Sequence, residues 1–261
     1  MEHTHFPTTC FISTRVRHRI TTVAMHDDTL VLVRRGIKTL LDSASSVAVK
    51  AGGSILLPRG SQWDVINDPA TDGRYEAVIL QFGDSVTADF QRMYAGEFKC
   101  APMDGCFKMP PCKPFEEAVL RAADAIGKSE TSPRLRHHRA MEVLLMLAER
   151  GCILRPRGEM TWPDRLHRVI AHRPHAAWSI ERLARACHTS ASTLRRRLAD
   201  HNVTVGGLVR EIRMESAMLL LQTTEFPVGE IAQRCGYDSH SRFSAAFKLR
   251  YGFSPSRLRK P

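Results

Sequence analysis

The chain has 261 residues, is 43% hydrophobic and carries a formal net charge of +11 at pH 7. This length can bury one or two hydrophobic cores, and we expect two domains. A membrane-spanning helix is excluded, because no apolar run approaches the roughly 18 residues that it needs. The first 20 residues lack a continuous apolar core, so we expect no signal peptide and a cytoplasmic protein.

Residues 20–82 show a pattern of short strands separated by turns. The segments TLVLVRRGIKTLLD, SVAVKAGGSILLPRG and RYEAVILQFG are rich in β-branched residues and bounded by Gly, Pro, Asn and Asp. They predict an antiparallel barrel or sandwich. The segment KAGGSILLPRGSQWDV resembles part of the small cupin-like sensor barrels that precede many bacterial DNA-binding domains. Metal-binding cupins supply a His-x-His pair here, whereas this chain has Gln62, Trp63 and Asp64, so we expect no metal and no cofactor.

A helical annex is predicted after the strands, from the segments PFEEAVLRAADAIGK and SPRLRHHRAMEVLLMLAERG. The second segment carries an apolar stripe near helical spacing, formed by Leu135, Met141, Leu144, Leu145 and Ala148. Two partners for this stripe stay open: the chain's own barrel, or a second copy in a homodimer. The stretch RPRGEMTWPD predicts a linker. We therefore place an N-terminal domain at 1–154, a linker at 155–161 and a C-terminal domain at 162–261.

The cysteines argue against an extracellular disulfide framework, because their number is odd and they are scattered along the chain. Three of them are separated by equal gaps of five residues: Cys100, Cys106 and Cys112. This spacing lacks the close pairs of zinc sites, although metal binding or redox sensing stays an alternative. Cys187 and Cys235 lie on the apolar side of short helices, where cysteine behaves as a small hydrophobic residue.

The C-terminal half contains one pattern written twice, as SIERLARACHTSASTLRRRL and PVGEIAQRCGYDSHSRFSAAF. Apolar positions of the two copies correspond at an offset of 48, and then of 49 after one inserted turn residue. Each copy predicts a short helix, a turn and a second helix. Ser179, Ser190 and Ser239 are placed as N-caps, and Pro227 opens the remaining helix. The pattern therefore predicts two helix-turn-helix units.

The positive charge is concentrated in the same half of the chain. Residues 161–261 hold 17 Lys or Arg against 8 Asp or Glu, whereas residues 1–160 hold 21 against 19. A basic excess confined to one module indicates a surface that binds a polyanion, and an anionic membrane surface would also be attracted. Together with the helix-turn-helix pattern, the charge favours double-stranded DNA.

Helical geometry assigns the exposed face of the first unit's second helix. With Leu194 at 0°, Leu198 falls at about 40°, and Arg195, Ser192 and Arg196 fall at about 100°, 160° and 200°. The last three face outward. Arg197 falls near 300°, at the flank, where it suits a phosphate. A triple-Arg run is usually a solvated face, but on this helix we expect base or phosphate contacts.

The same geometry in the second unit turns Ser241, Ser244, Ala245 and Lys248 outward. His240 and Arg242 lie in the first turn, where recognition helices meet base edges and phosphates. For His240 a solvated capping role is the alternative. The intervening segment TVGGLVREIRMESAMLLLQ predicts a long helix of about 26 Å, close to one turn of DNA at ~34 Å.

The C-terminal region resembles the AraC/XylS family of transcription regulators over residues 162–259. The resemblance rests on both helix-turn-helix units, REIRMESAMLLL, IAQRCGYDSHSRFSAAFK and YGFSPSRLR, and it is closest to the virulence-regulator branch. It implies an α+β protein with an N-terminal cupin-like β-barrel and a C-terminal all-α double helix-turn-helix domain. It also implies base contacts by a set of residues in the two units: Ser192, Arg195, Arg196, His240, Ser241 and Arg242.

The resemblance has further implications for partners. Some virulence relatives bind fatty acids through two lysines, and the corresponding positions here are Thr29 and Gln222. The second recognition helix often carries a long basic side chain where this chain has Ala245. We expect an activator that binds double-stranded DNA and RNA polymerase, with a homodimer and a small-molecule or protein effector as further partners.

The alternative hypothesis is an enzyme, namely an alkyl-repair methyltransferase that is tethered to DNA by a similar helix-turn-helix module. Such an enzyme needs a metal-bound or strongly activated cysteine. No cysteine here lies in a Cys-x-x-Cys pair or beside a clear activating base. We therefore expect no catalytic residues.

Overall fold

The computed structural model divides the chain into two compact units, residues 1–157 and 158–261, which are described separately. It describes residues 6–42, 45–71, 73–94, 96–98, 101–103, 105–156, 158 and 160–259. Within these ranges, none of the helices combines the length and apolar character that crossing a lipid bilayer requires.

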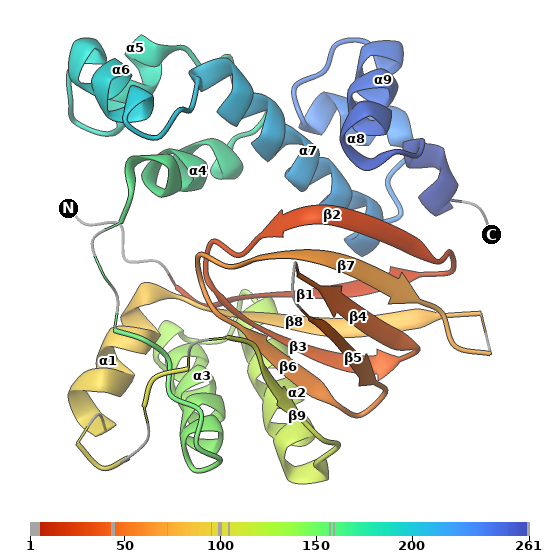
Figure 1. Cartoon of the computed structure of the whole chain (residues 1–261), viewed down its shortest axis with the longest axis vertical. Helices are drawn as coiled ribbons and strands as arrows, with labels where there is room; N and C mark the ends of the chain where they lie inside the picture. The colour runs from red at the N-terminus through yellow and green to blue at the C-terminus, as the bar shows by residue number, and fades with distance from the viewer. Residues whose placement is uncertain are drawn as a thin grey trace. The chain divides into compact units, whose positions relative to one another are not determined.

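The N-terminal unit contains two antiparallel sheets (Figure 1). The first has the order β1-β8-β3-β6-β9 and the second the order β2-β7-β4-β5. Their strands are β1 (Thr8–Thr14), β2 (His18–Ala24), β3 (Asp28–Arg35), β4 (Ile37–Leu41), β5 (Ser46–Lys50), β6 (Ser54–Leu57), β7 (Gln62–Asp68), β8 (Tyr75–Phe82) and β9 (Phe107–Met109). The expected α+β class is confirmed.

The strands form two open sheets rather than a closed barrel. Closure needs a ladder that joins the edge strands, and in the described part of the chain β1, β9, β2 and β5 each end a sheet. The two faces of β3 show why the first sheet has a core on each side. Leu30 and Leu32 enter one core, whereas Val31 and Val33 enter the core between the sheets. This is why β3 is continuously apolar instead of alternating.

Helices α1 (Asp84–Tyr94), α2 (Lys113–Gly127) and α3 (Pro133–Ala148) belong to the N-terminal unit, with α2 against β1 and β8 (Figure 1). The predicted apolar stripe lies on α3. Leu144 and Ala148 are 2% and 3% exposed in the core that joins the helices to the first sheet. Leu135, at 44%, is exposed. The stripe therefore packs mostly within its own unit, which is the first of the two expected partners, and a homodimer stays a prediction.

Lys38, which is 5% exposed, lies in the core between the sheets. Its Nζ donates to Asn67 Oδ1 at 3.1 Å and lies 5.9 Å from the centre of the Tyr75 ring. Burial lowers the pKa of Lys38 to about 8, while the nearby Cys10 acts weakly in the opposite direction. Burial also raises the pKa values of the Cys10 thiol, to about 11, and of the Tyr75 hydroxyl.

These values make the stability of the N-terminal unit depend on pH. Because the pKa of Lys38 is lower in the folded than in the unfolded chain, the unfolded chain binds more protons above about pH 8. Lys38 therefore makes the free energy of unfolding rise from pH 8 to 9. Cys10, whose pKa is raised by burial from 9.0 to about 11, opposes this rise increasingly as the pH approaches and passes 9. We expect Lys38→Met to flatten this rise in urea unfolding at pH 7, 8 and 9. An unchanged slope would show that Lys38 is charged in the folded unit.

The C-terminal unit is all helical. It comprises α4 (Trp162–His172), α5 (Ile180–Ala186), α6 (Ala191–Ala199), α7 (Val205–Thr223), α8 (Val228–Arg234), α9 (His240–Tyr251) and the 3₁₀ helix η1 (Pro255–Arg259). Helices α4 to α7 share one core that includes Leu166, Leu183, Leu194 and Ile212. Around α9, the rings of Phe243, Phe247, Tyr251 and Phe253 pack against one another.

Candidate nucleic-acid interface

The first helix-turn-helix unit is formed by α5 and α6. Ser179 caps α5 by accepting the backbone N–H of Arg182, and Ser190 caps α6 by accepting that of Thr193 at 3.0 Å. His188, in the turn between the helices, has a φ of 51°, the left-handed conformation that lets the chain reverse. The predicted capping residues of this unit are confirmed.

The second unit is formed by α8 and α9. Ser239 caps α9 by accepting the backbone N–H of Arg242, whereas Pro227 precedes α8 without a side-chain cap. The turn carries Gly236 at a φ of +78°, where a Cβ would lie 2.7 Å from Arg213 Nη2. Glycine is therefore needed both for the backbone conformation and for the approach of Arg213.

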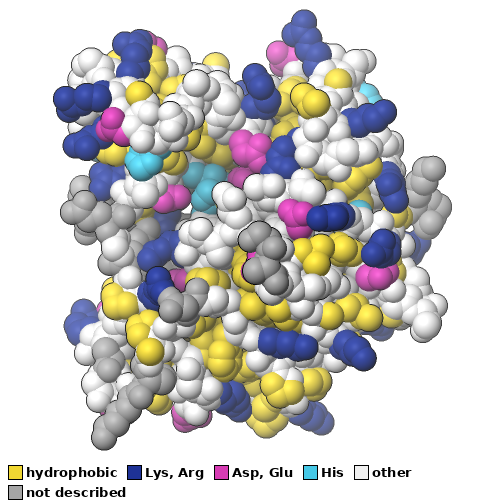
Figure 2. All heavy atoms as spheres, viewed as in Figure 1, with side chains coloured by type: hydrophobic (Ala, Val, Ile, Leu, Met, Phe, Trp, Pro, Cys, Tyr) yellow, Lys and Arg dark blue, Asp and Glu magenta, His cyan; other side chains and the backbone are white. Residues whose placement is uncertain are grey.

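The predicted contact residues of the first unit lie where helical geometry places them. Leu194 and Leu198 are buried, while Ser192, Arg195, Arg196 and Arg197 are exposed. In the second unit Phe243 and Phe247 are buried, and four of the predicted residues are exposed: His240, Ser241, Arg242 and Lys248. Lys and Arg side chains are prominent over the region of these helices (Figure 2). Whether these side chains contact DNA stays a prediction.

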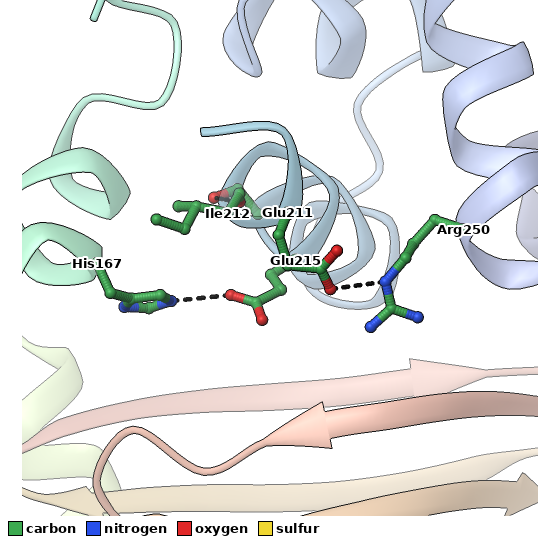
Figure 3. A network of polar contacts seen from close by, with 6 residues as sticks. His167, Glu211, Ile212, Glu215 and Arg250 are labelled. Atoms are coloured by element: carbon green, nitrogen blue, oxygen red, sulfur yellow. Dashed lines mark hydrogen bonds and ion pairs between the residues drawn. The ribbon is translucent and has the colours of Figure 1, made fainter. Parts of the chain in front are cut away.

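Helix α7 connects the two helix-turn-helix units. It contacts α4 through a glutamate–histidine hydrogen bond and α9 through an ion pair (Figure 3). Glu215 Oε2 lies 2.8 Å from His167 Nε2 of α4, and Glu211 Oε1 accepts from Arg250 Nε of α9 at 2.6 Å. Glu211 and Glu215 are one helical turn apart on α7. Glu215 contacts α4, near the first helix-turn-helix unit, and Glu211 contacts α9 of the second unit. Helix α7 therefore contacts both α4, which packs in the core of the first unit, and α9 of the second unit.

Arg213 of α7 adds a third connection. Its Nε donates to Pro174 O at 2.9 Å and its Nη2 to Ala176 O at 3.2 Å, both in the segment between α4 and α5. Its guanidinium also lies 5.8 Å from the centre of the Tyr237 ring, in the turn of the second unit. Arg213 thus contacts both helix-turn-helix halves, a role that the sequence pattern did not indicate.

One contact within the first unit was also missed by sequence reasoning. Arg195 Nη2 of α6 donates to Glu181 Oε1 of α5 at 3.2 Å. The two residues are 14 positions apart, so no local periodicity pairs them. Only the crossing of α5 over α6 brings the acid to the recognition helix.

The cysteines behave mainly as core residues. Cys187 and Cys235 are the C-caps of α5 and α8. Cys187 packs against the core of the first unit and Cys235 is fully buried, which agrees with the predicted apolar side, and burial raises the pKa values of both thiols. In the N-terminal unit, Cys106 and Cys112 are free thiols, and Cys100 lies outside the described residues. The pKa of Cys112 is lowered by a hydrogen bond from the Phe115 backbone and by Arg150.

Comparisons with known proteins agree with this geometry. A family model described as a helix-turn-helix domain matches residues 183–261. The urease operon transcriptional activator of Escherichia coli is 34% identical over 91 residues, which are 35% of this chain and 31% of that protein. The regulator YdeO of Escherichia coli K12 is 29% identical over 131 residues, which are 48% of this chain and 51% of that protein. The chain thus matches about a third to a half of these relatives' lengths.

Solved structures show the same fold over nearly the whole chain. ToxT from Vibrio cholerae, with an unsaturated fatty acid bound, has a TM-score of 0.59 at 15% identity, covering 98% of this chain and 95% of that chain. An apo ToxT variant has a TM-score of 0.63 at 16% identity, covering 98% and 97%. The predicted resemblance is confirmed for the C-terminal region: residues 183–261 match a helix-turn-helix domain of the AraC type, and the matching relatives are named as transcription regulators.

Proposed function

We propose that the protein is a sequence-specific DNA-binding transcription regulator, with the action of an activator. The observation that carries this proposal is a pair of helix-turn-helix units, each exposing a serine-capped second helix, connected by one long helix. Helix α7 has 19 residues, which corresponds to about 28 Å at 1.5 Å per residue. This length suits two recognition helices in successive major-groove segments on one face of the duplex.

The two units contribute differently in this proposal. Arg195 and Arg196 offer bidentate donors that suit guanine, and Ser192 lies beside them. Arg197 is better placed for a phosphate. The second unit contacts DNA through His240, Ser241, Arg242 and Lys248, with Ala245 where a longer donor would reach further.

Further partners are part of the same proposal. An activator contacts RNA polymerase, and the N-terminal unit is the part available for homodimerisation or for an effector. The ToxT structure contains a bound fatty acid. In this chain the two corresponding lysine positions are Thr29 and Gln222, both uncharged and buried. A different small molecule or a protein is therefore the better candidate effector.

The relatives are named as regulators, and the alternative of an alkyl-repair methyltransferase has no support among them. That reaction needs an activated thiolate. Burial instead raises the pKa values of four described thiols: Cys10, Cys106, Cys187 and Cys235. Cys112, whose pKa is lowered, lies in the N-terminal unit rather than in the DNA-binding one.

The test is salt-dependent DNA binding by the full chain and by residues 158–261. Lys and Arg contacts with phosphates release condensed counterions, so binding should weaken steeply with salt. Six or more such contacts would lower the affinity by about 10³-fold between 50 and 200 mM salt. Gel shifts across this range measure the slope. A folded fragment that binds no duplex, or binds it independently of salt, would contradict the proposal.

A further inference from the structure

The contact between Glu181 and Arg195 joins the two helices of the first helix-turn-helix unit. Arg195 Nη2 donates to Glu181 Oε1 at 3.2 Å, and the two side chains stay 62% and 59% exposed. An exposed ion pair of this kind adds little to stability. Its location matters more, because Arg195 is on the outward face of the proposed recognition helix α6.

Glu181 lies in the first turn of α5. Its pKa is lowered by hydrogen bonds from its own backbone N–H and from the Ser179 hydroxyl, and then by the charges of Arg195 and Arg185. Ser179 is also the N-cap of α5. The acid therefore favours the ionised form at the N-terminal end of α5, where it accepts a hydrogen bond from the Arg195 guanidinium.

The internal repeat provides a comparison within the same chain. At the established offsets, Glu181 corresponds to Gly229 and Arg195 corresponds to Ser244. The second unit forms the corresponding helices α8 and α9, of which only α9 has a side-chain cap, without either member of the pair. The Glu181–Arg195 pair is thus unnecessary for forming a helix-turn-helix. It is present only in the first unit, whose second helix carries long arginine side chains that can donate to bases.

A carboxylate beside a DNA-contacting helix repels phosphates and lowers affinity for any duplex. Within the function proposed above, we propose that Glu181 is a positioning residue that sets the base preference of the first unit. Its carboxylate holds one N–H edge of the Arg195 guanidinium. The remaining N–H donors point in one orientation, in which they donate bidentately to O6 and N7 of a guanine.

The experiment uses the full chain and duplexes selected by it from a random library. Dissociation constants are then measured for a selected duplex and for a shuffled duplex of the same composition. With Glu181→Gln, we expect the selected-to-shuffled ratio to fall about tenfold, with loss of the guanine preference at one position. Binding of the shuffled duplex should strengthen two- to threefold, on the order expected for removing one repelling charge.

Two further variants separate orientation from charge. Glu181→Asp keeps the charge but shortens the side chain, so the ratio should fall while affinity for the shuffled duplex stays constant. In an Arg195→Ala background, Glu181→Gln should change the ratio no further, since the positioned group is absent. Thermal melting of each variant confirms that the unit is folded.

Glu230→Gln is the matched control. Glu230 lies on the first helix of the second unit, and its Oε1 is 2.7 Å from Arg234 Nη2 of the same helix. We expect this change to strengthen binding of the shuffled duplex without altering base preference. The inference is overturned if Glu181→Gln and Glu230→Gln act alike, or if the effects of Glu181 and Arg195 are additive. If the wild-type chain selects no sequence at all, the proposed function itself fails.

Discussion

Replacing Leu144 and Leu145 with Glu should unfold the N-terminal unit. Leu144 is 2% exposed between α3 and its neighbours, and Leu145 packs against the same core. Removing a buried leucine side chain alone costs about 2–5 kcal/mol, and a buried carboxylate without a partner adds to that cost. Urea unfolding followed by circular dichroism measures the loss, with the C-terminal unit as an internal reference.

Leu135→Glu is the control on the same helix. Leu135 is 44% exposed, so this change should stay within about 0.5 kcal/mol of the wild type. Mass in solution is measured alongside unfolding. A double variant that stays folded but turns from dimer to monomer would show that the stripe on α3 is a dimer face and that the observed packing is wrong.

Arg195→Ala and Arg196→Ala should each cost about 1–3 kcal/mol on a selected duplex and little on a shuffled one. The reason is that a bidentate guanidinium discriminates between bases, whereas a phosphate contact does not. Both side chains are exposed on α6, whereas Leu194 and Leu198 of the same helix are buried. Fluorescence anisotropy titrations on the two duplexes measure the difference.

Lys248→Ala provides the comparison for a phosphate contact. Lys248 lies on the exposed face of α9, near its C-terminal end. We expect this variant to weaken both duplexes alike and to reduce the salt slope by about one unit. If the two arginine variants behave in the same way, Arg195 and Arg196 are phosphate anchors, and base recognition must come from other residues.

The sequence by itself determined the organisation of the DNA-binding unit. Capping serines, apolar spacing and the internal repeat are local signals, since each depends on residues within one or two helical turns. The caps Ser179, Ser190 and Ser239 are therefore present as predicted, and so is the burial of Leu194 and Phe243. The excess of Lys and Arg in residues 161–261 follows directly from the composition of the sequence.

Only the tertiary structure decided the long-range pairings. The open arrangement of the two sheets depends on which edge strands meet, and strand β9 and helix α1 left no clear pattern in the sequence. Arg213 contacts both helix-turn-helix halves, and Glu181 meets Arg195 from another helix. Such contacts join residues whose separation in the sequence is unrelated to any helical or strand period. They follow from how helices cross and pack, which a single sequence does not encode locally.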